Sequence, residues 1–177
     1  ARARRWSRVN FTSIGVRALD EHLGGGIQKG STVLVMGSPG SGTEFFAKQF
    51  ASVSTEPVTY FTSTERNEDV LSVMREYGWR TDLKIVNVGS KYYESVLAKK
   101  LEISKFRQEG IKLGDIRRFR DEDVAKEENL LTFLAYEVSK LTPPFRVVIN
   151  SLDFYLENYE SHEVLTAMRT IKAHTQH

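Results

Sequence analysis

The sequence contains no cysteine, and this absence excludes several chemistries at once. Disulfide bonds, zinc sites built on thiolates and cysteine nucleophiles all need that residue. The four histidines are scattered, which argues against a metal centre based on imidazole. The chain also lacks an apolar run of about 18 residues, the length of a membrane span, and its basic start is not followed by the apolar stretch of a signal peptide. We therefore expect a cytoplasmic protein with no membrane segment and no metal.

The size and composition fit one compact globular domain. The chain has 177 residues, of which 40% are hydrophobic and 27% are charged, and this leaves little room for a second folding unit. The formal net charge of +2 hides strong local clustering of charge. We divide the chain into a basic N-terminal arm, residues 1–10, and one domain over residues 11–177.

Charges of one sign cluster in three segments. The arm carries Arg2, Arg4, Arg5 and Arg8, residues 91–120 carry nine basic and four acidic side chains, and residues 121–130 are mostly acidic. Two interpretations fit this pattern. The clusters can form a solvated surface whose charges pair with one another, or the basic segments can bind nucleic acid or an acidic partner.

Short apolar runs alternate with longer segments of helical periodicity, and this pattern predicts an α/β fold with a mostly parallel sheet flanked by helices. The expected strands cover residues 32–36, 58–62, 84–88 and 146–150, and the first of them, rich in valine, is expected to be buried. The expected helices cover residues 44–52, 67–77, 92–106, 128–141 and 162–174. Residues 107–127 are charged, contain two glycines and lack periodicity, so we expect an exposed and poorly ordered loop there.

The most informative local pattern is the turn between the first expected strand and the first expected helix. It consists of Gly37, Ser38, Pro39, Gly40, Ser41, Gly42, Thr43 and Glu44. Its glycines match the first and sixth positions of the P-loop pattern G-x-x-x-x-G-K-[ST], in which backbone amides and a helix N-terminus cradle phosphates. The last two positions do not match, because Thr43 replaces the lysine and Glu44 replaces the hydroxyl. We expect a P-loop-shaped turn with incomplete chemistry.

Three further segments extend this match beyond the turn. They are Gly15–Leu23, which is followed by three consecutive glycines, Tyr60–Glu65, and Arg146–Leu152. In this order and at these intervals they resemble the archaeal KaiC-like and RadA-like ATPases of the RecA superfamily. The resemblance implies a RecA-like P-loop domain in which the second segment ends in two adjacent glutamates and the third forms the Walker B strand.

The departures from that family pattern fall on the positions that carry its chemistry. The resemblance implies a lysine at Thr43, a magnesium-binding hydroxyl at Glu44, a Walker B aspartate at Asn150 and a water-activating glutamate at Thr64. Of the glutamate pair, only Glu65 is kept. Because each change removes a group that ATP hydrolysis needs, Thr64, Glu65 and Asn150 are interpreted as vestigial catalytic positions. Lys48 lies one helical turn after Glu44, and we expect an ion pair between these two side chains.

The sequence thus predicts a RecA-like domain whose ATPase site is inactivated and which has a regulatory, signalling or interaction role. No cofactor is expected, or ATP or ADP bound weakly by residues 37–44. Two alternatives stay open: a weakly active nucleotide-binding ATPase with a non-standard site, and a nucleic-acid-associated accessory protein that uses the basic arm and residues 91–120.

A protein partner or a homo-oligomer is also expected, because proteins of the RecA superfamily commonly assemble into rings or filaments. RecA-like domains usually continue with further strands after the Walker B region, whereas this sequence ends at His177. Two interpretations stay open: a domain truncated at its C-terminus, or a chain that naturally ends there and has a sheet edge that is open or covered by another copy.

Overall fold

The computed structural model describes residues 10–94, 101, 104–105, 108 and 129–176. The predicted basic arm lies outside these residues, except for Asn10. So do almost all of the predicted loop over residues 107–127 and most of the basic segment over residues 91–120. Most of the helix predicted over residues 92–106 also lies outside the described part.

Three parallel strands form the central sheet, in the spatial order β4, β3, β5. The middle strand β3 (Val58–Thr62) is buried at all five positions, and β4 (Lys84–Asn87) and β5 (Arg146–Asn150) flank it. In this register, Tyr60 lies beside Ile85 of β4 and Val148 of β5. The sequence predicted β3 and β5 at their observed bounds because short segments rich in β-branched and aromatic residues favour strands.

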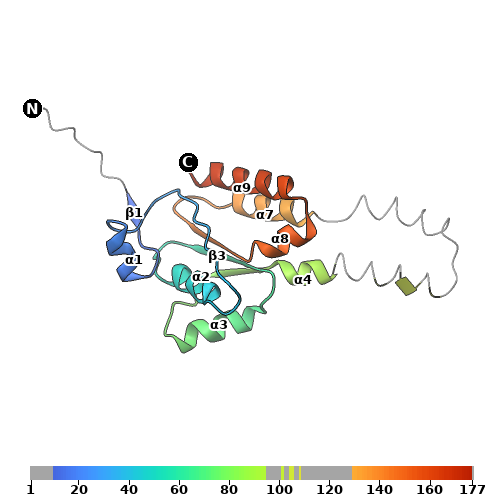
Figure 1. Cartoon of the computed structure of the whole chain (residues 1–177), viewed down its shortest axis with the longest axis horizontal. Helices are drawn as coiled ribbons and strands as arrows, with labels where there is room; N and C mark the ends of the chain where they lie inside the picture. The colour runs from blue at the N-terminus through green and yellow to red at the C-terminus, as the bar shows by residue number, and fades with distance from the viewer. Residues whose placement is uncertain (1–9, 95–100, 102–103, 106–107, 109–128, 177) are drawn as a thin grey trace, which may run out of the picture.

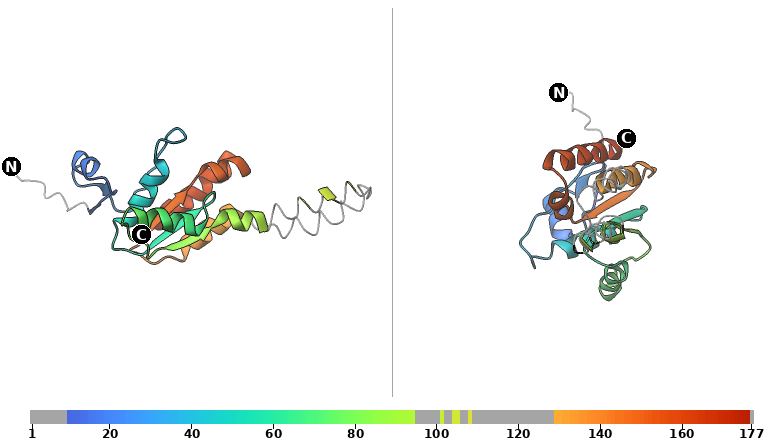
Figure 2. Two further views of the ribbon diagram at one scale, coloured as in Figure 1. Left: turned by 90° about the horizontal axis from the view of Figure 1, so that it is seen from below. Right: turned by 90° about the vertical axis from the view of Figure 1, so that its right-hand side faces the viewer.

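Helices cover both faces of this sheet (Figure 1). On one face, α2 (Thr43–Ser52) and α3 (Asn67–Glu76) pack through Ala51, Val70 and Met74. On the other face lie α7 (Leu130–Ser139), α8 (Asp153–Asn158) and α9 (Ser161–Thr175), which share a second apolar cluster with Phe61. Figure 2 shows the sheet between these two layers, with α7 and α9 side by side. The predicted α/β class is confirmed.

Capping side chains set several of the helix boundaries. The Asn129 side chain accepts hydrogen bonds from the backbone of Leu131 and Thr132, so α7 begins two residues later than predicted. Glu160 and Glu163 form a capping box at the start of α9. Asn87 caps α4 (Val88–Tyr92), and β4 therefore ends one residue earlier than predicted. α4 ends at Tyr92, the residue at which the helix predicted over residues 92–106 begins.

A small N-terminal unit precedes the sheet. β1 (Phe11–Thr12) pairs antiparallel with β2 (Ile27–Gln28), and α1 (Arg17–His22) connects them. Arg146, at the start of β5, ties this unit to the core. Its buried guanidinium donates to the Thr12 hydroxyl and to the Phe50 carbonyl, both at 2.7 Å, and lies over the Phe50 ring. Burial lowers the pKa of Arg146, because the charged form loses its hydration.

The first predicted strand is wrong. Residues 32–36 form no strand, and the whole segment from residue 31 to residue 40 is exposed. Val33 is 50% exposed, Leu34 64% and Met36 83%. Within the described part of the chain, no backbone hydrogen bond joins these residues to another segment. A strand exists only through hydrogen bonds to a neighbour, and an apolar composition does not provide one.

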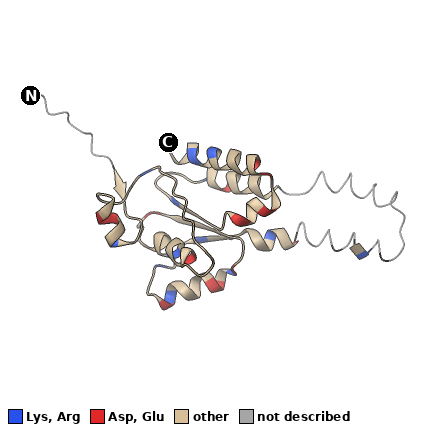
Figure 3. Cartoon of the chain, viewed as in Figure 1, with Lys and Arg blue, Asp and Glu red and all other residues tan. Residues whose placement is uncertain are grey.

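The described surface carries charges of both signs. Figure 3 shows lysine and arginine interspersed with aspartate and glutamate along the helices. Many of these charges pair locally, as Arg66 does with Asp69 and Arg17 with Glu21. In the described ranges, no helix combines the length and the apolar character needed to cross a membrane.

Candidate functional site

The predicted phosphate-binding turn is a compact turn that leads directly into α2. The Ser41 amide donates to the Ser38 carbonyl at 2.9 Å, with Pro39 and Gly40 at the two central positions. Gly40 has a φ of +79°, so these are the residues of a type II turn. Gly42 follows with a φ of +89° and precedes the first residue of the helix, a left-handed conformation that favours glycine. The structure has a turn and a helix in the predicted order, with α2 beginning one residue earlier than predicted, whereas residues 32–36 before the turn form no strand.

Neither of the first two residues of α2 carries a positive charge. They are Thr43 and Glu44, and the Thr43 hydroxyl lies 3.5 Å from the Glu44 carboxylate. A carboxylate in the first turn is stabilised by the positive end of the helix dipole. The end of the helix that would face a phosphate group therefore carries an anion of its own.

Two of the three positions interpreted from the sequence as vestigial, Glu65 and Asn150, come together at the carboxyl ends of the parallel strands. Glu65 follows β3, Asn150 is the last residue of β5, and Asn150 Nδ2 donates to Glu65 Oε2 at 2.9 Å. The same amide donates to the Tyr60 hydroxyl at 3.1 Å. Thr64, in contrast, is exposed, and its side chain makes no hydrogen bond to any described residue. The strand ends therefore assemble one carboxylate and one amide, but not the second acidic group.

Lys48 completes this cluster, and the predicted ion pair between Lys48 and Glu44 is wrong. Lys48 Nζ lies 2.8 Å and 2.9 Å from the two carboxylate oxygens of Glu65, and its side chain is only 1% exposed. The interpretation failed because it considered only partners on the same helix. Lys48 lies on the buried side of α2 together with Ala51, and a lysine on a buried helix face requires a carboxylate from another element.

The backbone of Glu65 is fixed as firmly as its side chain. Thr62 accepts a hydrogen bond from the Glu65 amide and donates its hydroxyl proton to the Glu65 carbonyl at 3.0 Å. Asn87, at the end of β4, donates to the same carbonyl at 3.2 Å. The Lys48–Glu65–Asn150 cluster, as we name it, thus links α2 to the ends of all three strands. Its geometry is set by the fold rather than by a ligand.

The buried hydroxyl of Tyr60 lies against this cluster and accepts a hydrogen bond from Asn150. Its side chain is fully buried, and burial raises its pKa above the ordinary value of 10.0, with a further contribution from the negative charge of Glu65. Tyr155, on the other face of the sheet, is also buried with a raised pKa, chiefly because burial disfavours the phenolate. Both phenols therefore stay protonated in the folded protein at a pH where unfolded tyrosine ionises.

We expect the free energy of unfolding to fall once the pH rises above about 10, because only the unfolded chain then loses these protons. Each buried phenol contributes a slope of up to about 1.4 kcal/mol per pH unit. Urea denaturation at a series of alkaline pH values measures the slope. The Tyr60→Phe variant should show a shallower slope, and Tyr60→Phe with Tyr155→Phe a shallower one still. An unchanged slope in the double variant would contradict the prediction.

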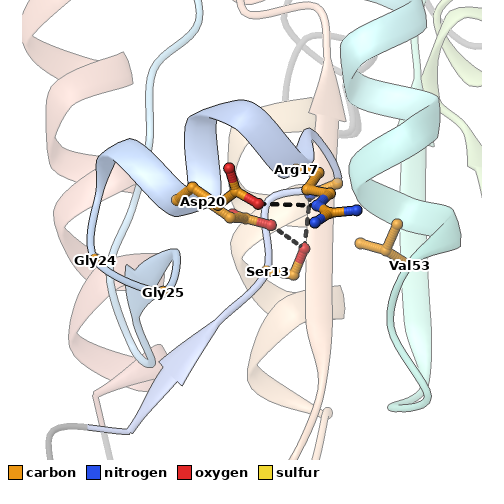
Figure 4. Close-up of a pocket in the computed structure, with 8 residues that line it drawn as sticks. Ser13, Arg17, Asp20, Gly24, Gly25 and Val53 are labelled. Atoms are coloured by element: carbon orange, nitrogen blue, oxygen red, sulfur yellow. Dashed lines mark hydrogen bonds and ion pairs between the residues drawn. The ribbon is translucent and has the colours of Figure 1, made fainter.

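A hollow of about 540 Å³ lies away from this cluster, between α1 and the end of α2 (Figure 4). The Asp20 carboxylate accepts hydrogen bonds there from the Ser13 hydroxyl and, at 2.9 Å, from the Ile14 amide. Arg17 pairs with Glu21 at 2.8 Å. These polar groups satisfy one another and hold the N-terminal unit together. No group of three or more histidine or acidic side chains suited to a metal ion occurs within the described ranges.

Comparison with known proteins identifies the family of this chain. A family model described as "ATPase: KaiC" matches residues 12–175, which is nearly the whole chain. UPF0273 proteins from Thermotoga maritima, Methanopyrus kandleri and Pyrococcus furiosus are 35%, 34% and 35% identical to it over 77, 74 and 74 residues. These alignments cover 42%, 40% and 40% of this chain and 32%, 29% and 30% of the relatives.

The chain therefore spans about a third of the length of these relatives. The family model extends from β1 to the end of α9 and includes the turn, the central sheet and the Lys48–Glu65–Asn150 cluster. Since it covers far more than half of the sequence, and the α/β architecture agrees with it, this chain belongs to the KaiC family of ATPases.

Proposed function

We propose that this KaiC-family domain does not hydrolyse ATP and that it has a regulatory or signalling role, exercised by binding a protein partner or a second copy of itself. The charges at the start of α2 carry the proposal. A triphosphate is strongly anionic, and the first turn of this helix presents Thr43, which is neutral, and Glu44, which is negative. A carboxylate there repels phosphate unless a cation compensates it.

The one cation of α2 is directed elsewhere. Lys48 is buried and is bonded to both carboxylate oxygens of Glu65, whose side chain is 26% exposed. Moving its ammonium to the turn would leave the Glu65 charge without its partner inside the protein, which is costly. At the far end of the site, Asn150 offers an amide where metal binding calls for a carboxylate. The residues present therefore do not fit a magnesium–ATP complex.

The exposed apolar run before the turn supports the interaction role. Four consecutive apolar side chains, Val33 to Met36, are between 42% and 83% exposed. Contiguous apolar surface of this kind is typical of a region that another molecule covers. A domain that acts by contact rather than by catalysis needs such a surface.

We expect the purified protein to release no phosphate from ATP above a buffer blank, and to bind magnesium–ATP more weakly than about 1 mM. Losing one preorganised group at a catalytic site commonly slows a reaction about 100- to 1000-fold, and here the loop, the metal position and the base are all altered. Phosphate release measures hydrolysis, and isothermal titration calorimetry measures binding.

Two substitutions in the turn test the charge argument directly. Thr43→Lys together with Glu44→Thr adds the cation and removes the repulsion, so nucleotide binding should become measurable. Hydrolysis should stay absent, because Asn150 and Thr64 are unchanged. Turnover by the wild-type protein would contradict the proposal if it survived repurification and fell when Gly42, which has a φ of +89°, was replaced by leucine.

A further inference from the structure

We infer that Lys48 is a built-in cation that closes this site to divalent metal ions, by supplying the positive charge that Glu65 would otherwise accept from a metal. The inference rests on the proposed function, because it states how the same site is kept inactive. The observation behind the inference is different, because it is the position of one buried ammonium group and not the charges of the turn. Metal binding without nucleotide tests it separately.

The groups that face Glu65 are hydrogen-bond donors. A metal ion needs oxygen ligands, whereas the carboxylate of Glu65 is met by the ammonium of Lys48 at 2.8 Å and 2.9 Å and by the amide nitrogen of Asn150 at 2.9 Å. An ionised carboxylate only accepts hydrogen bonds, so Asn150 must present its NH2 group rather than its carbonyl to it. These hydrogen-bond donors therefore suit a carboxylate whose negative charge is already balanced by the Lys48 ammonium group.

Burial makes this arrangement hard to open. The Lys48 side chain is 1% exposed and that of Glu65 is 26% exposed, so the ammonium lies on the protein side of the carboxylate. Interactions between charges strengthen as water is excluded, and a metal ion placed beside Glu65 would meet an ammonium within a few ångströms. The hydrogen bonds from Thr62 and Asn87 to the Glu65 carbonyl also keep its backbone from moving toward solvent.

Manganese binding in a set of matched variants tests the inference. Asn150→Asp adds a second carboxylate but keeps Lys48, and we expect it to bind Mn²⁺ no better than the wild-type protein. Asn150→Asp with Lys48→Met should bind Mn²⁺ at least about tenfold more tightly than Asn150→Asp alone, because the repelling ammonium is gone. The loss of the electron paramagnetic resonance signal of free Mn²⁺ measures binding, and thermal unfolding shows that each variant is folded.

The matched control is Asn150→Asp with Lys29→Met. It has the same net charge as the Lys48 double variant, but it removes a lysine that pairs with Glu56 on the surface, outside the cluster. We expect it to bind Mn²⁺ like Asn150→Asp alone. Equal Mn²⁺ binding by the two double variants, or tight binding by the wild-type protein that Glu65→Gln abolishes, would overturn the inference.

A second measurement needs no substitution at Lys48. Lysines of the wild-type protein are acetylated chemically with and without Mn²⁺, and the modified peptides are identified by mass spectrometry. Lys48 should stay unmodified under both conditions, while Lys29 and Lys84, with side chains 48% and 56% exposed, react. Modification of Lys48 only in the presence of Mn²⁺ would show that the ion displaces the ammonium group from Glu65. Modification with and without Mn²⁺ would show that the buried pair does not form. Either result would overturn the inference.

Discussion

Replacing Lys48 with alanine should lower the free energy of unfolding by about 2 to 3 kcal/mol. Removing one partner of a fully buried ion pair typically costs about 3 to 5 kcal/mol, because the remaining charge is left without compensation. The expected loss is smaller here because Glu65 keeps 26% of its side-chain exposure and can be hydrated in part. Urea denaturation at neutral pH measures the difference.

Lys29→Ala is the matched control. Lys29 makes an ion pair of similar length with Glu56, 3.0 Å, but its side chain is 48% exposed, and exposed pairs contribute less than about 1 kcal/mol. Lys48→Met with Glu65→Gln removes both charges of the buried pair and should recover much of the stability lost in Lys48→Ala. Equal losses for the two lysine-to-alanine variants would contradict a role for burial.

Replacing Leu134 with alanine should cost about 3 kcal/mol of stability. Leu134 is fully buried in the cluster that α7 and α9 share with the sheet. Truncating a buried leucine removes apolar contact and leaves a cavity that its neighbours fill only in part, which together cost about 2 to 5 kcal/mol. The midpoint of urea denaturation should fall accordingly.

The control for this substitution is Leu165→Ala. Leu165 lies on α9, in the same helical layer, but it is 57% exposed, and surface substitutions usually change stability by about 0.5 kcal/mol or less. If the two variants lost the same stability, the division between the buried and exposed sides of this layer would be wrong.

The strands of the central sheet could be predicted where the residues of a segment themselves favour a strand. β3 and β5 are short segments rich in β-branched and aromatic residues, and they lie at the predicted bounds. Helices α2, α3 and α9 follow the periodicity of their apolar positions to within two residues. The segment over residues 32–36 is more apolar than either strand but has no hydrogen-bonded neighbour among the described strands. Composition records the preference of a segment, whereas pairing depends on the rest of the fold.

The sequence predicted two residues of the site, Glu65 and Asn150, but not the ion pair between Lys48 and Glu65 at its centre. Family resemblance pointed to Glu65 and Asn150, and the carboxyl ends of neighbouring parallel strands bring them together. The partner of Lys48 was missed because Glu65 lies 17 residues further along the chain. Helical spacing identifies contacts within one helix only. A contact between a helix and a strand end depends on how the helix lies on the sheet, which the local sequence does not encode.

The exposed run Val33–Met36 also bears on how the protein behaves at high concentration. No charged side chain occurs between Gly30 and Glu44, and the valines of the run favour extended backbone. Proteins usually protect such segments with a lysine, a proline within the run or a covering element, because free backbone groups on separate molecules can pair with one another. Here Pro39 comes only after the run. At high concentration, this short neutral stretch is therefore a place where separate molecules can associate through their backbones.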